Sequence, residues 1–161
     1  MAFDIIFAQE ADIPEIIEFI KGIALYEKLA DQVTVTELQL KKALFGPRPF
    51  AEVIFLLEAG KKVAFAIFFH NFSSFSGKQG LYLEDLFVKP EFRGKGYGKA
   101  LLKYLAKLAV DRDCGRFEWT VLDWNKPAID FYLSMGSQAM DEWTVHRLSG
   151  KALLEAGRDL G

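Results

Sequence analysis

The chain has 161 residues, of which 51% are hydrophobic and 26% charged, and its formal net charge is −2. This balance is that of one ordinary globular domain, which we place over residues 1–161, and it excludes disordered and collagen-like proteins. The slight acidity also gives no field that would draw the chain to nucleic acid or to an anionic membrane.

Cysteine and histidine are scarce: there is one cysteine, Cys114, and two histidines, His70 and His146, far apart in the chain. A disulfide framework and a Cys or His metal site are therefore not expected. The apolar runs are too short to span a bilayer, and the first residues lack the basic and long apolar regions of a signal peptide. We therefore expect a cytoplasmic protein without a bound metal.

The first half of the chain predicts a strand, two helices and a hairpin. Asp12 and Glu15 are spaced as a capping box, and isoleucines at helical spacing follow them. Thr34 and Glu37 form a second such pair, and two apolar runs flank Gly60. In chain order we expect a strand over 3–9, a helix over 13–26, a shorter helix through 44, strands over 53–58 and 63–69, and a loop over 72–80.

The second half predicts strands that alternate with helices. The strand over 81–88 is unusual because it carries Glu84 and Asp85 among apolar residues. A glycine-rich loop and a long helix follow it. In chain order we expect a helix to about 112, a strand over 117–122, a helix over 127–135, a strand over 143–148 and a small helix near 153. This order predicts an α/β domain with a mixed central sheet flanked by helices, whose parallel pair is formed by 81–88 and 117–122.

The loop Arg93-Gly94-Lys95-Gly96-Tyr97-Gly98 is the clearest candidate for a binding site. Its glycines let backbone N–H groups converge on an anion, and the start of the next helix adds partial positive charge. Residues 89–107 hold six Lys or Arg and one acid, which suits a polyphosphate. The spacing fits neither a P-loop nor a dinucleotide-binding fingerprint. The alternative is a glycine-rich helix start with solvated lysines.

Taken together, these segments resemble a known family. Residues 93–98 resemble the Q/R-x-x-G-x-G/A pyrophosphate loop of the GCN5-related N-acetyltransferases (GNAT), and most of the chain is similar to their diamine and thialysine acetyltransferase branch. The segments that carry the branch resemblance are Leu25-Tyr26-Glu27, Gln32-Val33, Tyr82 to Val88, Trp124 to Tyr132, and Trp143.

The resemblance implies direct transfer of an acetyl group from acetyl-CoA to a primary amine within a ternary complex, without an acetyl-enzyme. It implies that backbone groups of Leu86, Phe87 and Val88 bind the thioester and pantetheine, while 93–98 bind the pyrophosphate. It further implies that Asn125 contacts CoA, that Tyr132 lies beside the sulfur, and that the protein is a homodimer.

Two side chains are candidates for the chemistry. An alkylamine is mostly protonated at pH 7, so a carboxylate in the cleft would help to deprotonate it, and Glu84 is the leading candidate. The Tyr132 hydroxyl can donate a proton to the leaving thiolate. Strand alternation places Glu84 and Asp85 on opposite faces unless a bulge intervenes. The alternatives are a structural acid and, for Tyr132, a core aromatic beside Phe131.

The amine itself is defined less well. Glu27, Glu84 and Asp85 together suit a polycation, and Tyr26 and Trp143 could hold its methylenes or ammonium group. The polyamine enzymes carry an acidic-aromatic pair before the Glu-Asp strand, and the corresponding residues 71–75 contain no carboxylate. That leaves room for short diamines, thialysine or lysine-like amino acids. The rival functions are a protein-lysine or N-terminal acetyltransferase and a non-catalytic acyl-CoA-binding regulator.

Overall fold

The elements of the N-terminal part follow the apolar spacing of the sequence. The structure is a computed structural model that describes residues 2–158, and it divides into a first compact unit, up to Thr120, and a second from Val121. The first unit contains β1 (Asp4–Phe7), α1 (Ile13–Tyr26), α2 (Glu37–Phe45), β2 (Glu52–Glu58), β3 (Lys61–Ser73), β4 (Lys78–Val88), α3 (Tyr97–Asp111) and β5 (Phe117–Trp119). Short 3₁₀ helices lie at Glu10–Asp12, Ala30–Gln32 and Pro90–Phe92.

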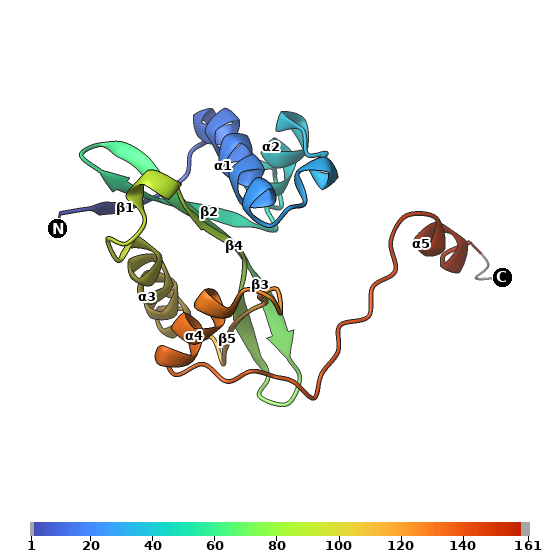
Figure 1. Cartoon of the computed structure of the whole chain (residues 1–161). Helices are drawn as coiled ribbons and strands as arrows, with labels where there is room; N and C mark the ends of the chain where they lie inside the picture. Colours follow the sequence, from blue (N-terminus) through green and yellow to red (C-terminus); the bar gives the residue numbers. More distant parts are fainter. Residues whose placement is uncertain (1, 159–161) are drawn as a thin grey trace. The chain divides into compact units, whose positions relative to one another are not determined.

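The five strands form one mixed sheet in the order β1-β2-β3-β4-β5 (Figure 1). Neighbouring strands are antiparallel except β4 and β5, which run parallel and are joined through α3. The α/β class, the hairpin around Gly60 and the parallel pair are thereby confirmed.

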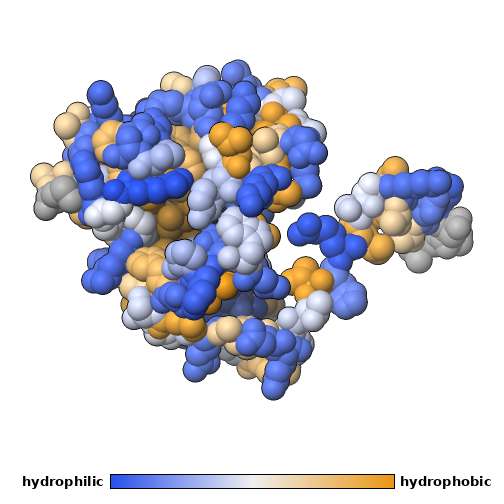
Figure 2. Space-filling model, viewed as in Figure 1, coloured by the Kyte–Doolittle hydropathy of each residue, from blue (hydrophilic) through white to orange (hydrophobic). Residues whose placement is uncertain are grey.

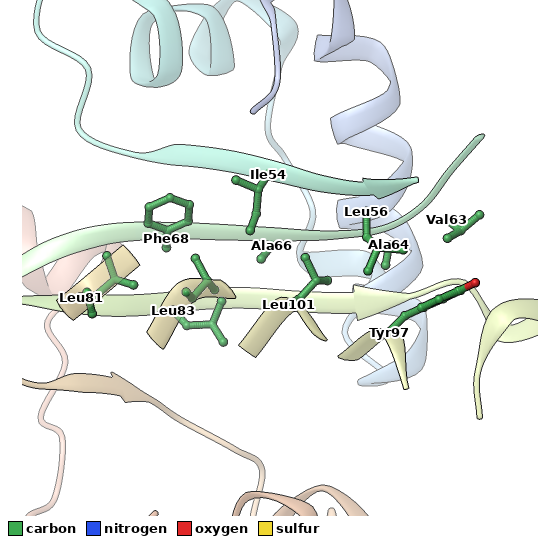
Figure 3. Packing of buried hydrophobic residues seen from close by; sticks show 12 residues of the cluster. Ile54, Leu56, Val63, Ala64, Ala66, Phe68, Leu81, Leu83, Tyr97 and Leu101 are labelled. Atoms are coloured by element: carbon green, nitrogen blue, oxygen red, sulfur yellow. The ribbon is translucent and has the colours of Figure 1, made fainter. Parts of the chain in front are cut away.

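Each face of the sheet has its own apolar core. Alternate residues of β2 and β3 pack against α1 and α2 on one face, with Phe19, Phe55 and Phe65 at the centre. The other residues of these strands pack against α3, through Leu101 and Leu105, in the cluster drawn in Figure 3. The sheet is thus a rigid layer between helices, and β4 carries its acidic residues in the middle of it.

Both predicted capping boxes are wrong in detail. The Asp12 carboxylate accepts a hydrogen bond from the Gln9 backbone N–H and pairs with Lys62 Nζ at 2.8 Å. Because Asp12 itself ends a 3₁₀ turn, its side chain does not cap α1, and Glu15 also pairs with Lys62. Helix α2 begins after Thr36, whose partner in a reciprocal capping box is Gln39.

The structure also differs from one loop prediction and two strand predictions. The region 72–80 is not a loop, because β3 continues to Ser73 and β4 begins at Lys78, so only a short turn separates them. Strand β5 is shorter than expected and ends at Trp119. Residues 143–148 form no strand, so this expectation is wrong: backbone propensity alone does not make a strand without a partner strand to share its hydrogen bonds.

The second unit contains α4 (Lys126–Ser134) and α5 (Gly150–Ala156). Residues 138–158 are all exposed, and Figure 2 shows hydrophobic residues, coloured orange, among the hydrophilic ones of this segment. Its large exposed apolar side chains are Met140, Trp143, Val145, Leu148, Leu153 and Leu154. Within residues 2–158, no helix combines the length and apolarity needed to cross a membrane.

Candidate active site

Strand β4 contains one extra residue at Glu84. Asp85 lies opposite Ile67 of β3, whereas Leu83 lies opposite Phe68, so Glu84 has no partner residue. This extra residue is a β-bulge, and it interrupts the regular alternation that would have placed Glu84 and Asp85 on opposite faces of the sheet. Asp85 shares the α1 face of the sheet with its partner Ile67, and the Glu84 side chain is exposed.

Glu27, Glu84 and Asp85 form a group of coupled carboxylates, which we call the acidic group. Burial raises the pKa of Asp85 to about 6, and the negative charges of Glu84 and Glu27 add to the rise. Partial burial and the charge of Glu84 also raise the pKa of Glu27. Such a group favours a cationic ligand, because a bound cation relieves the repulsion.

The acidic group does not meet the pattern of a metal centre. In the part of the chain that the structure describes, no three His, Cys, Asp or Glu side chains are arranged to hold a metal ion. An organic cation needs no such convergence of oxygen ligands, and aromatic faces can contact it instead. Tyr26, at the end of α1 beside Glu27, is one of the two aromatic residues that the sequence predicts for this purpose, and Trp143 is the other.

Arg93 connects the glycine loop with α1 and β4. Its Nε donates a hydrogen bond to the Val88 carbonyl oxygen at 3.0 Å. Its guanidinium carbon lies 5.0 Å from the centre of the Tyr26 ring and 5.3 Å from that of Phe87. The first residue of the predicted pyrophosphate loop thus contacts three other predicted site residues.

The loop itself has the geometry of an anion site. Gly94 and Gly96 have φ of 80° and 83°, which other residues rarely adopt, and a Cβ at either position would meet nothing within 4 Å. Gly96 is the residue before the first turn of α3, where backbone N–H groups have no partner inside the helix. Open space beside free N–H groups at a helix start fits a diphosphate.

Backbone near this loop is closely packed. A Cβ on Gly98 would lie 3.8 Å from Leu86 and 3.9 Å from Val88, so the start of α3 lies against the end of β4. A Cβ on Gly22 would lie 2.9 Å from the Phe87 ring, so a larger residue at this position of α1 would have to displace that ring. The predicted thioester-binding positions 86–88 therefore adjoin the loop and lie three residues or fewer beyond the acidic group.

Three predicted site residues belong to the second unit. Asn125 begins α4, and its side-chain oxygen accepts a hydrogen bond from the Ala128 N–H at 3.4 Å. Tyr132 lies on the same helix, with its ring centre 5.6 Å from that of Phe131. Trp143 is 78% exposed in the segment that follows. The structure brings together the predicted site residues of the first unit. That Asn125, Tyr132 and Trp143 also take part in the site is a proposal.

One residue near the loop carried no signal in the sequence. Glu58, the last residue of β2, contacts the side chains of Lys95 and Tyr97, more than thirty residues away in the chain. A carboxylate at the end of a strand beside a Gly turn is common at protein surfaces, and only the fold shows what it touches.

Comparison with known proteins identifies the family. The family model "Acetyltransferase (GNAT) family" matches residues 22–136. Thialysine N-epsilon-acetyltransferase of Sus scrofa is 36% identical over 159 residues, which cover 92% of this chain and 93% of that protein. L-ornithine N5-acetyltransferase NATA1 of Arabidopsis thaliana is 35% identical over 191 residues, which cover 91% and 84%.

A solved structure shows the same fold over the full length. The integron cassette protein VCH_CASS6 from the mobile metagenome of V. cholerae superposes with a TM-score of 0.81 at 28% identity, covering 98% of this chain and 99% of that one. The chain therefore belongs to the GNAT acetyltransferase family and is an N-acetyltransferase. Membership confirms the resemblance noted in the sequence and implies acetyl-CoA as the co-substrate.

Proposed function

We propose that the protein transfers the acetyl group of acetyl-CoA to a primary amine of a small molecule that carries a second cationic group. The observation that carries this proposal is the acidic group, whose three coupled carboxylates lie beside the predicted acetyl-CoA site. The names of two relatives support it, because thialysine and ornithine are small amino acids with a side-chain amine. A short diamine or a lysine-like amino acid is the substrate class.

The residues of the first unit fit acetyl-CoA. The N–H groups around Gly94 and Gly96 would hold its diphosphate, and the backbone of 86–88 would hold its pantetheine and thioester. Lys95, Tyr97 and Gly98 complete the loop, and Asn125 is proposed as a further contact from α4. We further propose that both compact units form one catalytic domain, since the family model spans the boundary between them.

Acetyl-CoA supplies the activated acetyl group, and the chain's side chains move the protons. Glu84 takes a proton from the substrate ammonium, directly or through water, and so frees the nitrogen lone pair for attack on the acetyl carbonyl carbon. Tyr132 gives its hydroxyl proton to the sulfur as the carbon–sulfur bond breaks, and the second proton that the nitrogen loses on becoming an amide returns to the Tyr132 oxygen. Asp85 is the second candidate base, because a pKa of about 6 lies closer to neutral pH than that of an ordinary aspartate.

The substrate side of the site is proposed from charge and aromatic rings. Glu27 and Asp85 attract the second cationic group, and Tyr26 and Trp143 contact its methylenes. The β3–β4 turn region lacks a carboxylate over 71–75, so the acidic group supplies the negative charge on its own. This arrangement suits a short molecule whose two cationic ends lie close together.

A panel of amines tests the proposal. With acetyl-CoA present, we expect release of free thiol with ornithine, lysine, thialysine and putrescine, and slower release with spermidine and with a lysine-containing peptide. Glu27→Gln should raise KM for the diamines by about 2–5-fold and leave KM for a monoamine of equal length unchanged, because it removes one partly exposed charge. Turnover of the peptide alone would contradict the proposal, and no thiol release with any amine would refute acetyl transfer to amines.

We also propose that the protein is a cytoplasmic homodimer. The exposed apolar side chains of residues 138–158 support a dimer, because a segment of this composition is stabilised when a second surface covers it. We expect light scattering at micromolar concentration to give twice the 18.2 kDa chain mass. A mass of one chain would contradict the dimer and leave the proposed reaction untouched.

A further inference from the structure

Glu58 holds two side chains of the glycine loop with a single oxygen atom. Its Oε1 accepts a charged hydrogen bond from Lys95 Nζ at 2.7 Å and a second hydrogen bond from the Tyr97 hydroxyl. These two donors flank Gly96, the residue whose left-handed conformation starts α3. One carboxylate thus fixes the loop on both sides of its critical glycine.

Tyr97 is anchored in the core on the α3 face of the sheet. It is 2% exposed, packs with the cluster around Leu101, and its ring lies edge-on to Phe3 at 6.0 Å between centres. Figure 3 shows its hydroxyl oxygen pointing out of the packed side chains, on the side of Val63. Because the hydroxyl emerges there, a partner at the end of β2 determines how the first residue of α3 is held.

Lys95 is held from two directions. Its ammonium lies 5.2 Å from the centre of the Phe92 ring and pairs with Glu58. Both side chains of the ion pair are partly covered, with exposures of 36% for Lys95 and 25% for Glu58. The hydrogen bonds from Lys95 and Tyr97 lower the pKa of Glu58, so the carboxylate stays ionised at neutral pH.

We infer that Glu58 is a positioning residue for the diphosphate-binding loop. It does not touch acetyl-CoA; it acts through Lys95 and Tyr97, which keep Gly94 and Gly96 in the conformation that directs their N–H groups to one point. Glycine loses the most conformational freedom on ordering, so a loop with three glycines binds more weakly when nothing restrains it beforehand. This inference rests on the proposed binding of acetyl-CoA at residues 93–98.

The opposite role is distinguishable. If Glu58 only competed with the diphosphate for Lys95, its removal would free a cation and tighten acetyl-CoA binding. A positioning role predicts the reverse, and it predicts that the loss depends on Tyr97 as well as on Lys95. Glu58→Gln keeps an acceptor for the Tyr97 hydroxyl but removes the charge that holds Lys95, whereas Glu58→Ala removes both interactions.

Titration calorimetry with acetyl-CoA on the full chain tests the inference. We expect Kd to rise about 2–5-fold in Glu58→Gln and about tenfold in Glu58→Ala, the loss expected from one or two released side-chain restraints. In steady-state assays KM for acetyl-CoA should rise in parallel, while kcat at saturation and KM for the amine change less than about twofold. Asp113→Asn, which removes the exposed 2.8 Å ion pair with Lys78, is the matched control and should bind as the wild type does.

A double-mutant cycle separates positioning from general loss of stability. Tyr97→Phe keeps the buried ring and removes only the hydroxyl, so adding Glu58→Ala to it should cost less affinity than Glu58→Ala costs alone. Additive losses, or unchanged or tighter binding in the Glu58 variants, would overturn the inference. Gly96→Asp, which adds a charge and strain at φ 83°, should lose binding in any case. Failure of the wild type to bind acetyl-CoA would instead refute the proposed function.

Discussion

Replacing Glu84 with Gln should lower kcat at pH 7 by about 10–10³-fold on the best amine, because the variant keeps the shape of the side chain and loses its basicity. Water can take part of the role, which limits the loss. The defect should shrink as the pH rises toward the amine pKa near 10.4, since a growing fraction of substrate arrives already deprotonated. A pH–rate profile of wild type and variant measures both effects.

Tyr132→Phe is the contrasting variant in the same experiment. It removes a hydroxyl and should lower kcat with little change in acetyl-CoA affinity, and its defect should not shrink with rising pH in the same way. Full activity of Glu84→Gln at pH 7 would move the base elsewhere, with Asp85 the next residue to replace. Full activity of Tyr132→Phe would assign Tyr132 to packing beside Phe131.

Replacing Asp85 with Asn should stabilise the protein without ligand at neutral pH. The folded state raises the pKa of Asp85 from 3.8 to about 6, so it binds the proton more tightly than the unfolded chain does. A rise of about 2 units corresponds to a penalty of about 3 kcal/mol for the ionised carboxylate in the folded protein. This penalty is absent below pH 4, grows between pH 4 and 6, and is complete above pH 6.

Denaturant unfolding at pH 4 and pH 8 checks this expectation. The free energy of unfolding of Asp85→Asn minus that of wild type should be about 3 kcal/mol larger at pH 8 than at pH 4. Taking the difference between two pH values cancels the constant effect of the Asn amide on packing. Asp113→Asn is the exposed control and should show no such difference. If this difference in free energy of unfolding were the same at both pH values, it would contradict a carboxyl of Asp85 that is destabilised by burial and by the charges of Glu84 and Glu27.

Local sequence signals predicted the parts of the fold that depend on neighbours in the chain. The isoleucines of α1, the leucines of α3 and the Gly60 turn report their own periodicity and turn chemistry, and they were found where expected. The glycine loop was also recognisable, because its residues act through their own backbone. These features need no knowledge of what lies across the sheet.

Features that depend on distant partners could not be predicted. Asp12 forms an ion pair with Lys62 instead of capping a helix. Glu58 forms hydrogen bonds with Lys95 and Tyr97, which are close to it only in the folded chain. The apolar pattern of 143–148 resembles a strand, but a strand requires a neighbour that the sequence does not name. We grouped Glu27 with Glu84 and Asp85 from the sequence, but the effect of its charge on the pKa of Asp85 is visible only once α1 lies on the sheet.

The extra residue in β4 affects where residues can be inserted into or deleted from the sequence. Leu81 and Leu83 face the α3 core before the bulge, and Leu86 and Val88 face it afterwards, so the strand changes phase at Glu84. Deleting this single residue would place Leu83 directly before Asp85, opposite Phe68 and Ile67, so regular alternation would return with the remaining side chains on their present faces. The turn between β3 and β4 has no such phase to keep. Residues inserted or deleted at 74–77 therefore leave the faces of both strands unchanged, whereas a residue inserted in β4 away from Glu84 would turn the residues on one side of it to the opposite face.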